Sequence, residues 1–221
     1  MTSPIAAIPA NTIAHLRKEF GGAGLSQARM AAHPMTQFAR WFDEASGAGL
    51  PELNAMSLAT VGIDGRPASR IVLLKDYGPQ GLTWFTHYDS RKGRQLRGNP
   101  YAALLFHWLG LERQVSIEGR VERLSAAENE AYFASRPLAS RLGAAASSQS
   151  QPIGSRALLD ARFAEAQARY GDAPPRPTNW GGYRLLPERM EFWQGGRARL
   201  HDRVLYTVGG DGDWQRLRLQ P

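Results

Sequence analysis

The feature that most constrains the fold is a series of short strand-like segments between residues 55 and 124. Met56–Ile63 and Ala68–Lys75 flank Asp64-Gly65-Arg66-Pro67, a sequence typical of a β-hairpin turn. Three further segments of this kind are Leu82–Tyr88, Tyr101–Trp108 and Arg113–Leu124. Strands joined by such short connections pair in antiparallel fashion. The pattern therefore predicts one antiparallel sheet through this part of the chain.

Helical patterns lie on both sides of these strands. The predicted helices are Thr12–Phe20, Met35–Ala45, Ser125–Ser135 and Ser155–Tyr170. In the third of them, Ser125 as N-cap and Glu128 three residues later form a capping box. Three closing strands are predicted around Tyr183–Phe192, Val204–Val208 and Trp214–Leu219. We therefore expect a mainly β (α+β) fold, an antiparallel barrel with surrounding helices. It would form a single domain over residues 1–221, with residues 1–12 flexible.

Composition narrows the classes of function. The chain has no cysteine, which excludes disulfides and thiolate metal sites, and its five histidines show no close pairing, so we predict no metal site. A net charge of +7 suits anionic partners, but the charge is spread along the chain and also fits ordinary surface charge. No segment resembles a signal peptide or a membrane span, which predicts a soluble cytoplasmic protein without membrane or nucleic-acid partners.

Ser90-Arg91-Lys92 is the first cluster with a chemical implication. Ser90 is a good N-cap for a helix running to about Gly98. Cations in a first helical turn oppose the helix dipole, unless a phosphate binds there and both of them reach it. The alternative is that both side chains are simply solvated.

Two further clusters offer several donors to an anion. Arg199, His201 and Arg203 would share one face of an extended strand, or else mark a solvent-facing sheet edge. Tyr132, Arg136 and Ser140 are spaced four residues apart and suit phosphate oxygens, although Pro137 makes Arg136 a helix end and the group could be a plain surface.

Together with Arg70-Ile71-Val72-Leu73-Leu74-Lys75, Leu111–Val115 and Glu191–Gly196, these clusters resemble the pyridoxine/pyridoxamine 5′-phosphate oxidase family over nearly the whole chain. The resemblance implies a split β-barrel homodimer with FMN bound at its interface. It also implies oxidation of pyridoxine and pyridoxamine 5′-phosphates to pyridoxal 5′-phosphate. Hydride would pass from C4′ of the substrate to FMN, and O2 would then be reduced to H2O2, with ammonia released from the amine.

The resemblance also assigns residues to these roles. The expected FMN-binding residues are Arg70, Ile71, Val72, Leu73, Leu74, Lys75, Phe85, Thr86, Arg91, Lys92, Gln114, Gln149, Ser150, Trp193 and Arg203. Lys75, Tyr132, Arg136 and Ser140 would bind the substrate phosphate. Arg199 and His201 would orient the substrate ring as the catalytic pair. Arg17, Lys18, Glu19 and Phe20 would contribute to a lid over the substrate. Because Arg70 and Lys75 point to opposite faces of a regular strand, we expect Lys75 at a strand end.

The chain departs from the family pattern in two places. Phe20 stands where a tyrosine is common, and Leu142–Ser148 is alanine-rich where a tryptophan is familiar. Three other functions remain open at this point. They are a related flavin oxidase acting on another substrate such as a phenazine precursor, a non-catalytic flavin- or pyridoxal-phosphate-binding protein, and a nucleic-acid-binding barrel.

Overall fold

The computed structural model describes residues 19–21, 24–210 and 212–221. Five α-helices are present in these residues: α1 (Pro34–Gly47), α2 (Arg91–Gly98), α3 (Ala126–Ser135), α4 (Leu138–Ala146) and α5 (Arg156–Tyr170). The strands are β1 (Ala55–Val61), β2 (Pro67–Leu73), β3 (Asp76–Gly78), β4 (Gly81–His87), β5 (Tyr101–Trp108), β6 (Arg113–Arg123), β7 (Trp180–Gln194), β8 (Asp202–Val208) and β9 (Trp214–Leu219). Short 3-10 helices cover Gln27–Arg29, Leu109–Leu111 and Arg197–Arg199.

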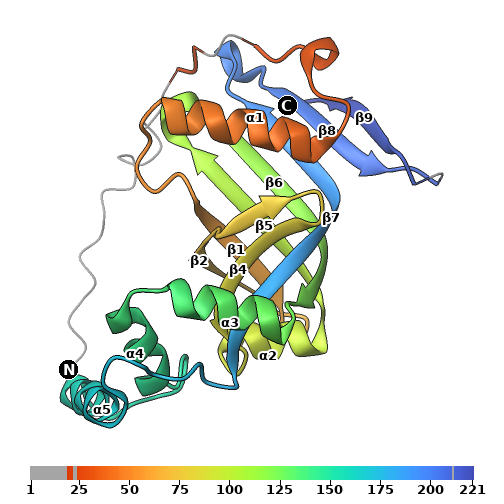
Figure 1. Ribbon diagram of the computed structural model, residues 1–221. Helices are drawn as coiled ribbons and strands as arrows, with labels where there is room; N and C mark the ends of the chain where they lie inside the picture. Colours follow the sequence, from red (N-terminus) through yellow and green to blue (C-terminus); the bar gives the residue numbers. More distant parts are fainter. Residues whose placement is uncertain (1–18, 22–23, 211) are drawn as a thin grey trace, which may run out of the picture.

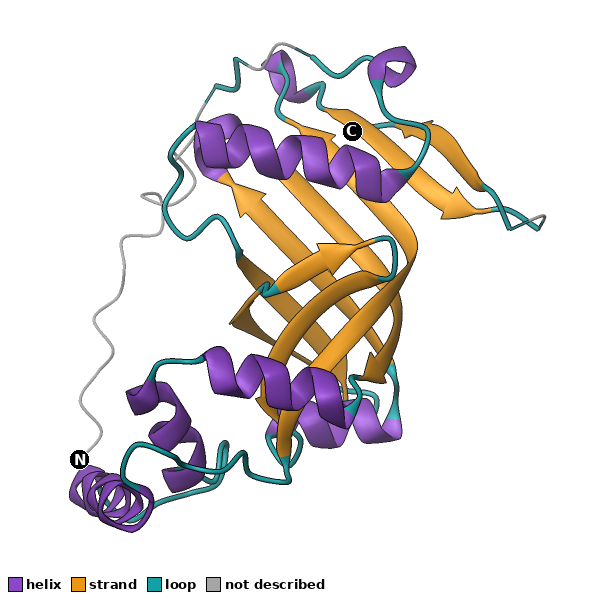
Figure 2. Ribbon diagram, viewed as in Figure 1, coloured by secondary structure: helices purple, strands orange, loops and turns teal. Residues whose placement is uncertain are grey.

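All nine strands belong to one antiparallel sheet that curls into a partly open barrel, as Figures 1 and 2 show. The order is β2-β1-β5-β6-β7-β4-β3, with β8 and β9 attached to the far part of β7. Along one edge, β7 pairs with β4 through its first residues and with β8 through its last residues. Along the other edge, β7 pairs with β6. One long strand therefore joins the barrel to the β8–β9 ribbon. The register shift between Glu118 and Gly119, opposite Pro187, is the bulge that bends the sheet there.

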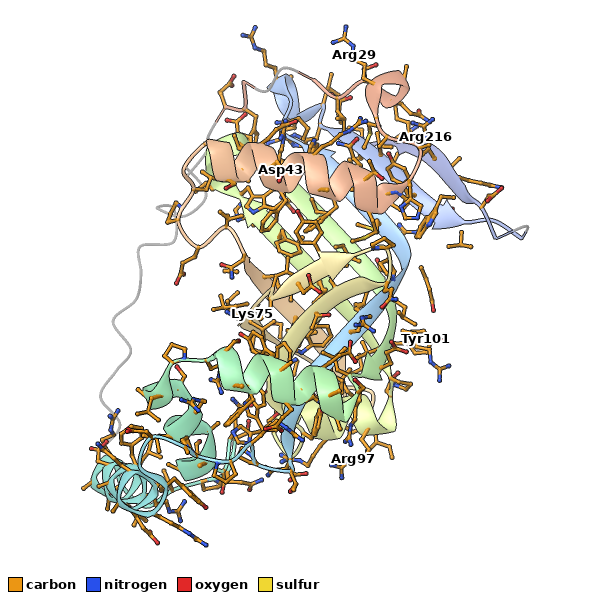
Figure 3. The ribbon with its side chains drawn as sticks, viewed as in Figure 1. Arg29, Asp43, Lys75, Arg97, Tyr101 and Arg216 are labelled. Atoms are coloured by element: carbon orange, nitrogen blue, oxygen red, sulfur yellow. The ribbon has the colours of Figure 1, made fainter. Side chains whose placement is uncertain are left out.

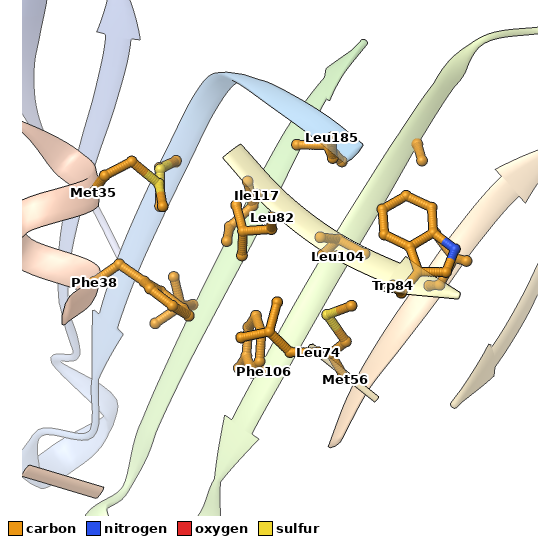
Figure 4. Packing of buried hydrophobic residues seen from close by; sticks show 14 of the residues in the cluster. Met35, Phe38, Met56, Leu74, Leu82, Trp84, Leu104, Phe106, Ile117 and Leu185 are labelled. Carbon is orange, nitrogen blue, oxygen red and sulfur yellow. The ribbon is translucent and has the colours of Figure 1, made fainter. Parts of the chain in front are cut away.

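The core fills the inside of the curled sheet, because alternate residues of the strands point inward. β1 and β5 alternate buried and more exposed residues along their length, and in β6 the side chains of Val115, Ile117 and Val121 are buried. Figure 4 shows Met56, Leu82, Trp84, Leu104 and others packed together in this interior. α1 closes one end of the barrel, and its Phe38 ring lies 5.1 Å from that of Phe106.

A buried polar network fixes α3 against the start of β7. The Asn129 side chain accepts from the Gly182 backbone N–H at 2.6 Å and donates to the Leu124 carbonyl and the Tyr88 hydroxyl at 3.2 Å. Tyr88 in turn donates to the Gly182 carbonyl at 3.2 Å. The predicted capping box at Ser125 and Glu128 is present. This network determines where the C-terminal end of α3, and the residues after it, lie relative to the sheet.

The helix predicted at Thr12–Phe20 falls mostly outside the described residues, and Glu19 and Phe20 within it are not helical. Residues 1–12 also lie outside them. The helix α4 was not predicted from the sequence. No helix in the part of the chain that the structure describes is long and apolar enough to cross a membrane.

Candidate functional site

A cavity of about 380 Å³ opens between the barrel and the helices α3 and α4; we call it the α3–α4 cavity. Its lining residues come from β4, the segment after β2, both helices and the start of β7. They are Lys75, Phe85, Thr86, His87, Tyr132, Arg136, Ser140, Gly143, Ala144, Ser147, Gln149 and Trp180. All four residues expected to bind the substrate phosphate are among them. Figure 3 shows Lys75 on the flank of the barrel above α3 and α4.

Arg136 lies at the corner between α3 and α4. Its extended backbone ends α3, as Pro137 predicts, so Tyr132, Arg136 and Ser140 come from a helix, a corner and a second helix. The Arg136 guanidinium stacks over the Trp180 ring at 4.7 Å, and Tyr132 stacks on Phe85 with ring centroids 3.7 Å apart. One terminal nitrogen of Arg136 is buried without a hydrogen-bond partner among the described residues. Burial lowers the pKa of Arg136. A buried guanidinium with a free donor is suited to an anionic ligand.

Lys92 lies beside the same cavity, in the first turn of α2. Its ammonium donates to Thr86 Oγ1 at 3.0 Å and to Gln149 Oε1 at 3.1 Å. Ser90 caps this helix, as the sequence predicts. Burial, with a smaller contribution from the positive charge of Arg70, lowers the pKa of Lys92 to about 8. Among the described residues no carboxylate hydrogen-bonds Lys92, so its positive charge is available to a bound anion.

Arg70 points from β2 across β1. Its guanidinium donates to Thr60 Oγ1 at 2.6 Å, to the Leu58 carbonyl at 3.1 Å and to Gln95 Oε1 at 3.3 Å. Burial first, and then the nearby charge of Arg91, lower its pKa. Lys75 follows the end of β2, as expected, and lines the cavity, whereas Arg70 does not. Ile71 and Leu73 face outward, Val72 is half-buried and Leu74 is buried in the core.

The remaining predicted residues gather at the far part of β7. Gln114, Trp193 and Arg203 are direct neighbours across β6, β7 and β8. His201 packs against Trp193 at 4.6 Å and against Phe20 at 5.3 Å between ring centroids. The Nδ1 atom of His201 accepts from the Gly196 N–H, so its Nε2 carries the proton in the neutral ring. Arg203 pairs with Glu191, and this carboxylate raises the pKa of Arg203. Glu191 was not among the predicted site residues.

The prediction that Arg199, His201 and Arg203 share the face of an extended strand is wrong. Arg197–Arg199 form a short 3-10 helix in which Ala198 and Arg199 both have positive φ, and β8 begins only at Asp202. The chain turns there because Gly196 N–H bonds back to His201, and Arg199 lies exposed on the turn. Glu19, Arg91 and Ser150 are exposed as well, and Arg17 and Lys18 lie outside the described residues.

Within one chain, the predicted residues around the α3–α4 cavity form one group and those around Trp193 form a second, while Ile71 of β2 is level with Ser116 and Glu191 across the sheet. Thr86 lies opposite Gly181 near the start of β7, and Trp193 lies twelve residues further along that strand. At roughly 3.3 Å per residue, the path along β7 between them is about 40 Å. Figure 1 shows the same division: α3 and α4 lie at one end of the barrel, and β8 and β9 at the other.

Two models of known protein families match this chain, one over the barrel and its helices and one over the C-terminal strands. Residues 42–170 match the family model "Pyridoxamine 5'-phosphate oxidase", and residues 180–221 match "Pyridoxine 5'-phosphate oxidase C-terminal dimerisation region". The chain belongs to the pyridoxine/pyridoxamine 5′-phosphate oxidase family. A relative of that name from Herminiimonas arsenicoxydans is 62% identical over 210 residues, which cover 95% of this chain and 100% of the relative. One from Burkholderia multivorans is 56% identical, covering 95% and 99%.

Solved structures of the oxidase family share the fold. PhzG from Burkholderia lata, in complex with tetrahydrophenazine-1-carboxylic acid, superposes with a TM-score of 0.86 at 35% identity, covering 90% of this chain and 99% of that one. A pyridoxamine 5′-phosphate oxidase-related FMN-binding protein from Nostoc punctiforme superposes with a TM-score of 0.70 at 18% identity, covering 87% and 100%. The predicted split barrel is thereby confirmed.

Sequence reasoning missed His87, Trp180 and the small residues Gly143, Ala144 and Ser147 that line the α3–α4 cavity. Trp180 reaches the cavity from a segment far along the chain, and no local motif marks it. The alanine-rich stretch Leu142–Ser148 contributes Gly143, Ala144 and Ser147 to the lining of the cavity.

Proposed function

We propose that the protein oxidises pyridoxine 5′-phosphate and pyridoxamine 5′-phosphate to pyridoxal 5′-phosphate, with FMN as cofactor and O2 as electron acceptor. H2O2 would be released, together with ammonia from the amine. The observation that carries this proposal is the α3–α4 cavity, where Lys75 and Arg136 offer two charges and Tyr132 and Ser140 offer two hydroxyls. A neutral ligand could not use so many donors, whereas a phosphate could.

The residues beside this cavity also fit FMN. Arg70, Arg91 and Lys92 supply three cations, and among the described residues the half-buried ammonium of Lys92 hydrogen-bonds only to the neutral side chains of Thr86 and Gln149, which supports a phosphate there. When bound, FMN would take hydride from the substrate and pass the electrons to O2. Residues of the α3–α4 cavity would hold the substrate by its phosphate. Arg199 and the Nε2–H of His201, which belong to the second group of residues, would orient its ring.

We further propose that the enzyme is a homodimer, in which the α3–α4 cavity of one chain meets the Trp193–His201 group of its partner. The distance between the two groups within one chain supports this arrangement, as does the family's dimerisation region at residues 180–221. Because β7 pairs with strands of both matched regions, we treat the whole chain as one domain. We expect this dimer to act in the cytoplasm.

A second candidate is the oxidation of a reduced phenazine precursor, which the likeness to PhzG favours. A steady-state assay of H2O2 production separates the two functions. We expect turnover with pyridoxine 5′-phosphate and pyridoxamine 5′-phosphate, and little with unphosphorylated pyridoxine. Turnover of a reduced phenazine carboxylate alone would favour the second candidate. Bound flavin without peroxide from any of these compounds would favour a binding protein.

The purified protein should be yellow and contain FMN rather than FAD, since the chain offers one terminal phosphate site and no dinucleotide-binding motif. Dissociating the dimer should release the flavin, because each FMN would contact both chains. Chromatography of the released cofactor and light scattering across a dilution series test these points. A monomer that keeps a full complement of flavin would contradict the shared site.

FMN affinity should fall as the pH rises above about 8. The pKa of Lys92 is lowered to about 8 in the free protein, and a bound phosphate raises it, so the protonated form binds the anion more tightly. The decrease should approach about tenfold per pH unit until the pKa of the bound state is reached. Flavin-fluorescence titrations of the apoprotein between about pH 7 and pH 9.5 measure it. Lys92→Met should bind weakly at every pH, and an unchanged affinity in the parent protein would refute the role of Lys92.

A further inference from the structure

His87 is a cavity residue to which neither the sequence nor the proposed function gives a role. It is the last residue of β4, directly opposite Trp180 of β7, and it lines the α3–α4 cavity together with Lys75, Tyr132 and Arg136. Its side chain is only 5% exposed. An imidazole buried beside a cluster of cations is unusual enough to need an explanation.

Charged and polar side chains from several elements surround His87. Lys92 of α2 and Arg136 after α3 act on it with positive charge. Asp89 acts with negative charge, and Asn179, just before β7, hydrogen-bonds the imidazole while donating its own amide to Asp89 at 3.0 Å. Burial is the largest of these influences, and it lowers the pKa of His87 below its ordinary value. The imidazole of the ligand-free protein is therefore mostly neutral at pH 7.

Two buried nitrogens beside the cavity have no hydrogen-bond partner in the residues described: Nδ1 of His87 and one terminal nitrogen of Arg136. A buried polar atom left unpaired costs about 1–3 kcal/mol, so such atoms call for a compensating ligand. The Nδ1 atom of His87 therefore has no described group that satisfies it while the cavity is empty.

We propose that His87 is a proton-binding member of the phosphate pocket, neutral when the pocket is empty and protonated when a phosphorylated ligand is bound. The proposal rests on the proposed function, since it takes the ligand to be a pyridine phosphate held by Arg136. Two negative charges added beside Arg136 and Lys92 offset the positive potential that disfavours the imidazolium, so the protonated form gains. The neighbouring Asn179, whose amide donates to Asp89, favours that form as well.

Proton uptake makes binding pH-dependent in a defined direction. A ligand that raises the pKa of His87 must bind the protonated protein more tightly, so its affinity falls as the pH rises from the pKa of the free state to that of the bound state. Each unit of difference corresponds to about tenfold in the dissociation constant. The second ionisation of the ligand phosphate, near pH 6, acts in the opposite direction, so only comparison with a variant lacking the imidazole isolates the effect.

The test is isothermal titration of the FMN-loaded enzyme with 4-deoxypyridoxine 5′-phosphate, which lacks the oxidisable group at C4′. Titrations at about pH 7 in two buffers of different ionisation enthalpy give the number of protons taken up. The parent is compared with His87→Asn, which keeps an amide near the Nδ1 position, and with His87→Gln, which keeps one near Nε2. Neither amide titrates. The ring nitrogens of His87 in histidine-labelled parent protein, followed by NMR with and without ligand, give a reading that needs no variant.

We expect the parent to take up more protons than either variant, and its dissociation constant to rise about three- to tenfold more than theirs between about pH 6.5 and pH 8.5. In the NMR spectra, His87 should change from neutral to protonated on binding. Equal proton uptake in all three proteins, or a ring that stays neutral in the complex, would overturn the proposal. If the analogue binds no more weakly to Arg136→Ala than to the parent, the proposed function fails instead, which keeps the two failures distinct.

Discussion

Replacing Arg136 by alanine is expected to lower kcat/KM for pyridoxine 5′-phosphate by about 10- to 150-fold. A hydrogen bond to a charged group contributes about 1.5–3 kcal/mol, and 1.4 kcal/mol corresponds to about tenfold. The loss should appear mainly in KM, because the phosphate is remote from C4′ and is held alike in the ground and transition states. Steady-state assays of peroxide production with phosphorylated and unphosphorylated pyridoxine measure both parameters.

Arg156→Ala is the matched control. Arg156 is an exposed arginine on α5 that pairs, among the described residues, only with Asp160 in the next turn, so its removal should leave kcat/KM unchanged. Flavin content should be the same in all three proteins, because Arg136 is not among the hydrogen-bond partners described for Lys92. If Arg136→Ala keeps the full preference for the phosphorylated substrate, the assignment of the α3–α4 cavity is wrong.

Asn129→Ala should lower the free energy of unfolding by about 2–4 kcal/mol. The change leaves the buried Gly182 N–H without its acceptor and the Leu124 carbonyl without one donor, and each unpaired group costs about 1–3 kcal/mol. Thermal unfolding should shift downward by roughly 4–15 °C, at about 2–4 °C per kcal/mol for a chain of this size. KM should rise as well, because this side chain fixes the helix that carries Tyr132 and leads into Arg136.

Tyr88→Phe and Ser135→Ala complete that comparison. Tyr88→Phe removes a single hydroxyl from the same network and should cost about 1 kcal/mol. Ser135 is exposed on α3 and bonds only to its own helix, so its replacement should change stability by no more than about 0.5 kcal/mol. An Asn129→Ala protein as stable as Ser135→Ala would show that the network does not hold α3 in place.

Local chemistry allowed most elements to be predicted from the sequence. The capping box at Ser125, the N-cap at Ser90 and the hairpin turn at Asp64–Pro67 each involve residues within a few positions of one another, so their consequences can be read along the chain. The end of α3 at Arg136 followed in the same way from Pro137.

Features set by distant parts of the chain could not be predicted in that way. The turn at Arg197–Arg199 depends on a bond between Gly196 and His201, and nothing in the local pattern excluded an extended strand. The aromatic wall under Arg136 depends on Trp180, which pairing with β4 brings beside His87. The family resemblance grouped the site residues by role, but only the fold shows that the α3–α4 cavity and the residues around Trp193 lie at opposite ends of β7.

The most direct test of the proposed function is the flavin absorbance spectrum of the purified enzyme during anaerobic addition of pyridoxine 5′-phosphate. We expect one equivalent of substrate to bleach the oxidised flavin band and to yield one equivalent of pyridoxal 5′-phosphate. Admitting air should restore the band and release H2O2. A flavin that stays oxidised with both pyridine phosphates, or that is bleached only by a reduced phenazine carboxylate, would contradict the account.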